Sequence, residues 1–156
     1  TLMRSSAASD VYKRQVDNET LYKECDILSL HMPLLDSTRH FVNAETIAKM
    51  KDGVTIINCA RGELMNIPDM IRGIETQKIG ALALDVFDKE DGIYHENRRD
   101  DILSNRDMAY LRQFPNVIMT QHMAFYTDAA VQSMVFCGIE GLCDFAKTGH
   151  TATELV

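Results

Sequence analysis

Apolar residues occur along this chain in short runs, separated by polar segments of helical length. Four runs have the length of a buried strand, at residues 26–30, 54–57, 80–84 and 116–120. Helical segments are predicted at residues 17–24, 44–50 and 69–77, and a longer one follows the last strand. Continuous apolar strands that alternate with helices are typical of a parallel sheet covered on both faces. The pattern therefore predicts an α/β fold with a doubly wound parallel sheet.

The longest predicted helix begins at Asp128, after Thr127 as its N-cap, and stops at Gly149. Its apolar positions recur at helical spacing and share one stripe, which consists of Val131, Met134, Val135, Gly138, Leu142 and Phe145. Such a stripe requires a packing partner.

Residues 1–15 show neither an alternating nor a helical apolar pattern. They begin without Met, are rich in Ser and Ala, and resemble translated sequencing-adaptor read-through. We therefore expect residues 1–15 to be an artefactual, disordered tail, and the true coding sequence to be truncated upstream of Val16.

Length and charge narrow the function classes. With 156 residues the chain can form one domain with a core, but not two domains of ordinary size. Its 16 Lys and Arg against 23 Asp and Glu give a net charge of −7, which argues against a nucleic-acid or anionic-membrane surface. A small molecule or a protein is the expected partner. Neither a run of apolar residues long enough to span a membrane nor a signal-peptide pattern is recognised, which predicts a soluble protein.

The four cysteines form no C-x-x-C pair and have no histidines at zinc-finger spacing. They are Cys25, Cys59, Cys137 and Cys143. We expect reduced thiols in a cytoplasmic protein, and no metal site.

Polar side chains follow each predicted strand, where ligands bind in open parallel sheets. These residues are His31, Met32 and Pro33 after the first strand, Asn58 to Gly62 after the second, Asp85 after the third, and Gln121 and His122 after the fourth. Taken singly, an arginine here is usually a surface ion-pair partner, a histidine is usually structural, and Glu90 belongs to a solvated charge run. Their coincidence at one edge predicts a catalytic constellation.

Several motifs resemble one family. They are Asn58-Cys-Ala-Arg-Gly-Glu-Leu64, Gly80-Ala-Leu-Ala-Leu-Asp-Val86 and His122-Met-Ala-Phe-Tyr-Thr127, with Cys25–Leu34 and Thr46–Gly53 in the same order. From Val16 to Val156 the chain resembles the NAD-dependent D-2-hydroxyacid dehydrogenases. The resemblance implies that residues 16–121 form the C-terminal half of a Rossmann-type NAD-binding domain. Residues 122–156 would be a C-terminal segment that returns to the substrate domain.

The resemblance also implies catalytic roles. Arg61 would hold the substrate carboxylate by a two-pronged contact and polarise the keto oxygen. His122 would protonate that oxygen as hydride arrives from the nicotinamide, and Glu90 would orient the imidazole and favour its charged form. Phe125 would form part of the substrate pocket wall, and Cys59 would line the pocket without acting as a nucleophile. The residues implied to lie along the cofactor NAD are His31, Met32, Pro33, Thr38, Cys59, Ala60, Arg61, Asp85, His122 and Ala124.

Details within the family favour one substrate. Phe125 and Tyr126 after the histidine, the polar insertion at residues 96–107 and the ending at residues 153–156 resemble fermentative bacterial D-lactate dehydrogenases. Pyruvate is therefore the expected substrate and a homodimer the expected parent enzyme. Two alternatives stay open: a dehydrogenase for another D-2-hydroxyacid, or an NAD-binding interaction protein of the kind that transcriptional corepressors of this fold represent.

The chain departs from the family pattern at two positions: Gln121 stands where many members have Pro, and Asn66 where Asp is common. In addition, the eight glycines form no G-x-G-x-x-G, the loop that binds the cofactor pyrophosphate. We therefore expect the 156-residue chain alone to bind NAD weakly, to show no measurable turnover and to aggregate.

Overall fold

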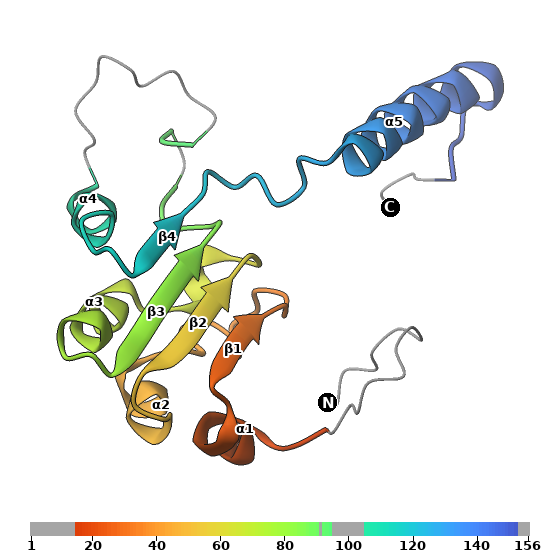
Figure 1. Cartoon of the computed structure of the whole chain (residues 1–156). Coiled ribbons are helices and arrows are strands. Elements are labelled where there is room, and N and C mark those ends of the chain that lie inside the picture. Colours follow the sequence, from red (N-terminus) through yellow and green to blue (C-terminus); the bar gives the residue numbers. More distant parts are fainter. Residues whose placement is uncertain (1–14, 91, 95–104, 153–156) are drawn as a thin grey trace. The chain divides into compact units, whose positions relative to one another are not determined.

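The structure of the chain, a computed structural model, describes residues 15–90, 92–94 and 105–152 (Figure 1). It divides into two compact units, residues 1–120 and residues 121–156, and each is described by itself. Three features noted in the sequence lie wholly or mostly outside the described residues: the tail at 1–15, the insertion at 96–107 and the ending at 153–156.

The described residues of the first unit form four strands and four α-helices. In chain order the elements are α1 (Asn18–Glu24), β1 (Ile27–Leu30), α2 (Ala44–Lys49), β2 (Val54–Asn58), the 3-10 helix η1 (Gly62–Leu64), α3 (Ile67–Glu75), β3 (Ile79–Leu84), α4 (Arg106–Leu111) and β4 (Val117–Met119). The predicted strands are confirmed to within one residue at each end. Helix α3 begins two residues earlier than predicted, because the Asn66 side chain caps it by accepting from the Asp69 N–H.

All four strands are parallel and lie in the order β1-β2-β3-β4. The register places the last residues of the strands side by side: Leu30 pairs with Asn58, Asn58 with Leu84, and Leu84 with Met119. The predicted parallel α/β sheet is therefore confirmed. Its four carboxyl ends meet at one edge, at the tips of the arrows in Figure 1.

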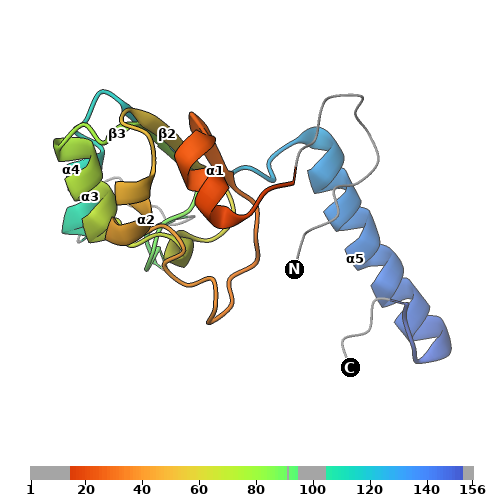
Figure 2. The ribbon, with the colours of Figure 1, turned by 90° about the horizontal axis from the view of Figure 1, so that it is seen from below.

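The helices of this unit lie in a row on one face of the sheet, with α1 against α2, α2 against α3, and α3 against α4 (Figure 2). Crossovers between parallel strands are almost always right-handed. Because each strand pairs with the next strand in the sequence, such crossovers place the connecting helices on the same side of the sheet. The sequence predicted cover on both faces. In the described residues of this unit the opposite face is open: Ile27 of β1 and Ile118 of β4 are 62% and 67% exposed.

Between the helices and the sheet lies a core of aliphatic and methionine side chains. Its most deeply buried large members are Leu30, Ile56, Leu64, Met65, Met70, Ile79, Leu82, Leu84, Met108 and Leu111. The last two come from α4, which the sequence analysis did not predict. That helix has six residues, and these two apolar positions are too few to show a helical period.

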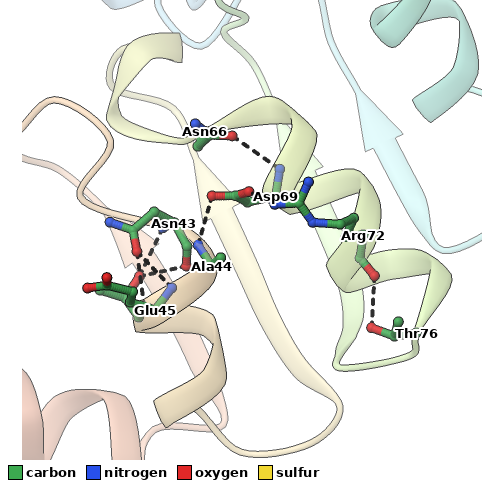
Figure 3. Close-up of polar contacts among 8 residues, drawn as sticks. Asn43, Ala44, Glu45, Asn66, Asp69, Arg72 and Thr76 are labelled. Atoms are coloured by element: carbon green, nitrogen blue, oxygen red, sulfur yellow. Dashed lines mark hydrogen bonds and ion pairs between the residues drawn. The ribbon is translucent and has the colours of Figure 1, made fainter.

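The Asp69 carboxylate joins helices α2 and α3 (Figure 3). It is buried and accepts the backbone N–H of Ala44, at the start of α2, over 2.8 Å. Its other oxygen pairs with Arg72, one turn further along α3. Asn43 completes this helix start in a capping box with Thr46. These bonds hold the amino-terminal ends of α2 and α3 together.

The second unit contains one long helix, α5 (Asp128–Thr148), with the predicted boundaries. The Thr127 hydroxyl accepts from the Ala130 N–H over 3.2 Å, and Gly149 ends the helix with a φ of 75°. The predicted apolar stripe is exposed at nearly every position, for example Leu142 at 73%.

In the part of the chain that the structure describes, α5 is the one helix long and apolar enough to cross a membrane by length and composition alone. The sequence analysis recognised no such segment. These two criteria are weak evidence for a membrane span, because core helices of soluble proteins also meet them.

Replacing Asp69 with Ala should lower the free energy of unfolding of this chain by about 1 to 3 kcal/mol, because the part-buried Ala44 N–H loses its acceptor. Urea denaturation followed by circular dichroism measures the change. Asp52→Ala is the matched control, since Asp52 pairs with Lys78 but its side chain is 91% exposed, and it should leave the stability almost unchanged. Equal losses in the two variants would contradict a joining role for Asp69.

Candidate active site

A buried amide shapes the loop that follows β2. Asn58, the last residue of this strand, is 0% exposed. Its Nδ2 donates to the Arg61 carbonyl over 2.8 Å, and its Oδ1 accepts from the Ala60 N–H over 3.0 Å. Both polar ends of the amide are therefore used inside one tight loop, which fixes the backbone that presents Arg61. The sequence analysis quoted Asn58 but gave it no role.

Arg61 lies at the top of this loop with an exposed side chain. Its backbone is extended, and its Nη1 donates to the Ala60 carbonyl over 2.7 Å. A guanidinium has five N–H donors in a planar fork, so one bond to its own loop is compatible with a two-pronged contact to a carboxylate. The substrate-binding role that the resemblance implies for Arg61 stays a prediction.

Asp85 lies directly after β3 and is only 4% exposed. Its backbone N–H donates to the Asn58 carbonyl over 3.0 Å, which places it beside the Arg61 loop. Its carboxylate accepts from the hydroxyl of Thr120, just after β4. Thr120 was missed by the sequence analysis, because a threonine at a strand end carries no signal of its partner. The bond ties the ends of two neighbouring strands together.

Cys59 stands next to this carboxylate. Burial raises the pKa of its thiol, and the negative charge of Asp85 raises it further. A thiol with a raised pKa is mostly protonated at neutral pH and is therefore a poor nucleophile. The raised pKa agrees with the expectation that Cys59 is not a nucleophile. That it lines a pocket stays a prediction.

Glu90 lies in a tight turn after β3, where Lys89 and Gly92 have φ values of 60° and 71°. It is half-buried, and its Oε2 accepts from the Phe87 N–H over 2.8 Å. Burial raises the pKa of the nearby Tyr94 hydroxyl, and the charge of Glu90 raises it further. Glu90 is thus a fixed carboxylate rather than part of a solvated charge run. Tyr94, which the sequence analysis also missed, lies close to it.

The residues after β1 form an ordered loop. The exposed His31 hydrogen-bonds through Nε2 to the Ser29 hydroxyl, 2.7 Å away. The Thr38 hydroxyl donates to the Pro33 carbonyl and accepts from the Leu35 N–H, each over 2.8 Å. Thr38 therefore holds the shape of this loop. Met32 is half-buried against the core, and Pro33 is exposed.

The second unit carries the remaining predicted residues. His122 is half-buried and has a φ of 53°, in the left-handed region that side chains with a Cβ seldom adopt. Such backbone strain concentrates at functional positions. Ala124 and Phe125 are exposed, and the rings of Phe125 and Tyr126 meet edge to face with centroids 6.1 Å apart.

Among residues 15–90, 92–94 and 105–152, no group of three or more His, Cys, Asp and Glu side chains lies close enough to hold a metal ion.

Residues 2–124 match the model of the D-isomer specific 2-hydroxyacid dehydrogenase NAD binding domain. The chain belongs to this family. The family resemblance and the cofactor NAD are thereby confirmed. The match begins inside the segment expected to be an artefactual tail, whose structure lies outside the described residues, and that expectation stays a prediction.

Relatives and solved structures of the family agree with this assignment. An aromatic 2-oxoacid reductase of Clostridium sporogenes is 44% identical over 138 residues, which are 88% of this chain and 42% of the relative. A D-lactate dehydrogenase from Treponema pallidum superimposes with a TM-score of 0.85 at 31% identity, over 94% of this chain and 47% of that one. The NAD-complexed D-isomer specific 2-hydroxyacid dehydrogenase from Lactobacillus delbrueckii ssp. bulgaricus gives 0.80 at 31%, over 88% and 42%. The chain thus spans less than half the length of these relatives.

Cys59 and Ala60 are small residues in the loop after β2, and the buried carboxylate of Asp85 lies beside Cys59. A carboxylate accepts hydrogen bonds, as the amide N–H groups of a nicotinamide require. The pyrophosphate requires a glycine-rich loop, which the eight glycines of this sequence do not form.

The raised pKa of Cys59 predicts slow alkylation. At pH 7.5, iodoacetamide should modify Cys59 several-fold more slowly in the folded chain than in the chain unfolded in urea, and the folded-state rate should rise with pH. Peptide mass spectrometry measures the rates, with Cys143, which is exposed as Cys59 is, as an internal reference for reagent access. Faster labelling of Cys59 in the folded chain would reveal an activated thiolate and contradict its assignment as a lining residue.

Proposed function

We propose that this chain is the C-terminal part of an enzyme that reduces a small 2-oxo acid with NADH, and that its reaction is pyruvate to D-lactate. The observation that carries the proposal is the shared edge of the sheet. There the register places the Arg61 loop beside Asp85, while Glu90 is fixed in the turn that follows. A cationic guanidinium and a fixed carboxylate are two of the groups that such a reduction uses.

Substrate binding falls to Arg61. Its guanidinium pairs with the carboxylate of the 2-oxo acid and polarises the adjacent keto oxygen, a planar geometry that lysine does not reproduce. The Asn58 amide holds the loop in place, so the guanidinium starts from a fixed backbone. A pre-organised loop lowers the entropy lost when the substrate is oriented for reaction.

The proton comes from His122. When bound, NADH would supply a hydride for the keto carbon. The imidazolium of His122 would donate its proton to the keto oxygen, which would give the 2-hydroxy acid. In the oxidation direction the neutral imidazole removes the hydroxyl proton. Glu90 orients the imidazole and favours its charged form, because a nearby negative charge stabilises a positive one.

The choice of pyruvate rests on the aromatic pair Phe125 and Tyr126, with Phe125 as the wall of a small substrate pocket. A second candidate is an aromatic 2-oxo acid, favoured by the 44% identity to the aromatic 2-oxoacid reductase of Clostridium sporogenes. We propose for the whole protein a cytoplasmic homodimer. The 156-residue chain by itself should bind NAD weakly and show no measurable turnover, since it contains no pyrophosphate-binding loop.

The test is an NADH-oxidation assay of the full-length protein, obtained by recovering the upstream coding sequence from the source DNA. Pyruvate, phenylpyruvate, longer 2-oxo acids and hydroxypyruvate are compared by kcat/KM, and the product is assigned by chiral chromatography. Fast turnover of pyruvate to D-lactate supports the proposal. A preference for phenylpyruvate moves the protein to the aromatic substrates. NAD binding without turnover of any 2-oxo acid favours an NAD-binding interaction protein instead.

Replacing His122 with Ala in the full-length protein should lower kcat by about 10² to 10⁴, because the proton donor is lost. Steady-state kinetics measure the change. His150→Ala, which removes an imidazole just beyond α5, serves as the control and should keep the original rate. A loss below about threefold for His122→Ala would mean that another group supplies the proton.

Replacing Glu90 with Gln should move the pH profile of pyruvate reduction to lower pH. Reduction needs the charged imidazole, which is present at low pH and lost as the pH rises, and without the carboxylate this loss occurs earlier. Gln keeps an oxygen that accepts from the Phe87 N–H, so the turn is preserved. An unchanged profile of kcat/KM against pH would remove Glu90 from the pair.

A further inference from the structure

Gly62 is a point of contact between two loops of the candidate site. It is buried, follows Arg61 and begins η1. A Cβ at this position would meet the carbonyl carbon and oxygen of Phe87 and the nitrogen of Asp88 inside 3.0 Å, a separation that real Cβ atoms essentially never show. The Cα of Gly62 therefore rests directly on the peptide group that joins Phe87 to Asp88.

That peptide group belongs to the turn that carries Glu90. The Phe87 N–H donates to Glu90 Oε2 over 2.8 Å, so the carboxylate is tied to the residue that Gly62 touches. On the other side of the contact, Arg61 is the immediate neighbour of Gly62. One backbone contact thus separates the loop that presents the guanidinium from the turn that presents the carboxylate.

The backbone segments on both sides of this contact are held in place by other interactions. The Arg61 loop is held by the buried Asn58 amide. The residues that follow Gly62 bond to the segment before α2. The His40 N–H donates to the Glu63 carbonyl over 2.8 Å, and the Val42 N–H donates to the Leu64 carbonyl over 3.0 Å.

The turn on the other side is anchored by the Phe87 ring, which lies in the core at 3% exposure. With both loops anchored, their separation depends on how closely the backbones approach at Gly62.

We propose that Gly62 is a positioning residue, which sets the separation between Arg61 and Glu90 by allowing the two loops to meet without a side chain between them. The inference rests on the proposed function, since it assigns these two groups to one reaction. An added methyl group forces the loops apart, and the substrate carboxylate is then held out of line with the proton-donating pair. Misplacements on the order of 1 Å cost rates on the order of 10²-fold.

The test is Gly62→Ala in the full-length protein. It should lower kcat/KM for the preferred 2-oxo acid by roughly 10- to 100-fold, with a larger change in KM for the oxo acid than in the Kd for NADH. Because the proposed function pairs Glu90 with His122, a displaced Glu90 should also shift the pH profile in the direction expected for Glu90→Gln. Fluorescence titration with NADH and kinetics across pH give the two readouts.

Gly80→Ala is the matched control. A Cβ at Gly80 meets the backbone oxygen of Gly53 at 2.5 Å, the same kind of clash between backbones, but at the amino end of β3 and away from the site. This variant should lose stability as Gly62→Ala does, yet keep its KM and its pH profile. The comparison separates damage to the fold from displacement of the two loops.

A second variant covers the case in which Gly62→Ala does not fold. Phe87→Leu shrinks the buried anchor of the opposing turn without adding atoms, and should change KM and the pH profile in the same direction by a smaller factor. The double variant Gly62→Ala with Phe87→Leu should lose less kcat/KM than the product of the two single losses, because the turn can then withdraw from the new methyl group.

The outcomes are distinct. If the unsubstituted protein turns over no 2-oxo acid, the proposed function fails, and this inference fails with it. If the unsubstituted protein is active and Gly62→Ala matches Gly80→Ala in KM and pH profile, the inference alone is overturned. If only Phe87→Leu folds and its pH profile is unchanged, the inference is overturned as well.

Discussion

The alignment of four parallel strand ends is the constraint on which the other features of the site depend. Leu30, Asn58, Leu84 and Met119 are joined in one continuous register. Every loop that carries a candidate functional group therefore starts from the same line across the sheet. A shift of one residue in any pair would turn the side chains of that strand to the opposite face and break the core. The register that buries the apolar residues is thus also the register that gathers the polar ones.

Above this line the loops are held by polar groups that are themselves buried. Asn58 uses both ends of its amide within its own loop, and Asp85 is tied to Thr120 and to the Asn58 carbonyl. Buried polar groups are costly unless they are paired, so a loop held in this way has few alternative conformations of similar energy. Rigidity at the edge of the sheet is what a reaction that depends on orientation requires.

The sequence predicted those features that depend on one strand or on one chemical group alone. The apolar runs located all four strands, and the rule that ligands bind at strand ends selected Arg61 and Asp85. The motif around Arg61 identified the family. Periodicity did not reveal α4, because its two buried apolar residues are too few to show a helical period. It also did not reveal the open face of the sheet, because that face depends on the order of the strands in space.

Residues whose role depends on their hydrogen-bond partners were also missed in the sequence. Asn58 and Thr120 matter because of the partners that the folded chain brings to them, and those partners lie in loops or on neighbouring strands. Gly62 was quoted within a motif, but its importance arises from a backbone that lies 25 residues further along the chain. The spacing of residues along a sequence does not show which backbone segments approach each other in the fold. Contacts of this kind become visible only in three dimensions.

The order of the strands also bears on how the sheet is assembled. Each strand pairs with the strand that precedes it in the chain, and each helix packs against its neighbours in sequence. Every new pairing therefore joins strands that are consecutive in this chain, and none has to wait for a distant part of it. Loop closure between consecutive strands carries a modest entropic cost. These four strands can consequently be added to the sheet one at a time and in chain order as the polypeptide leaves the ribosome.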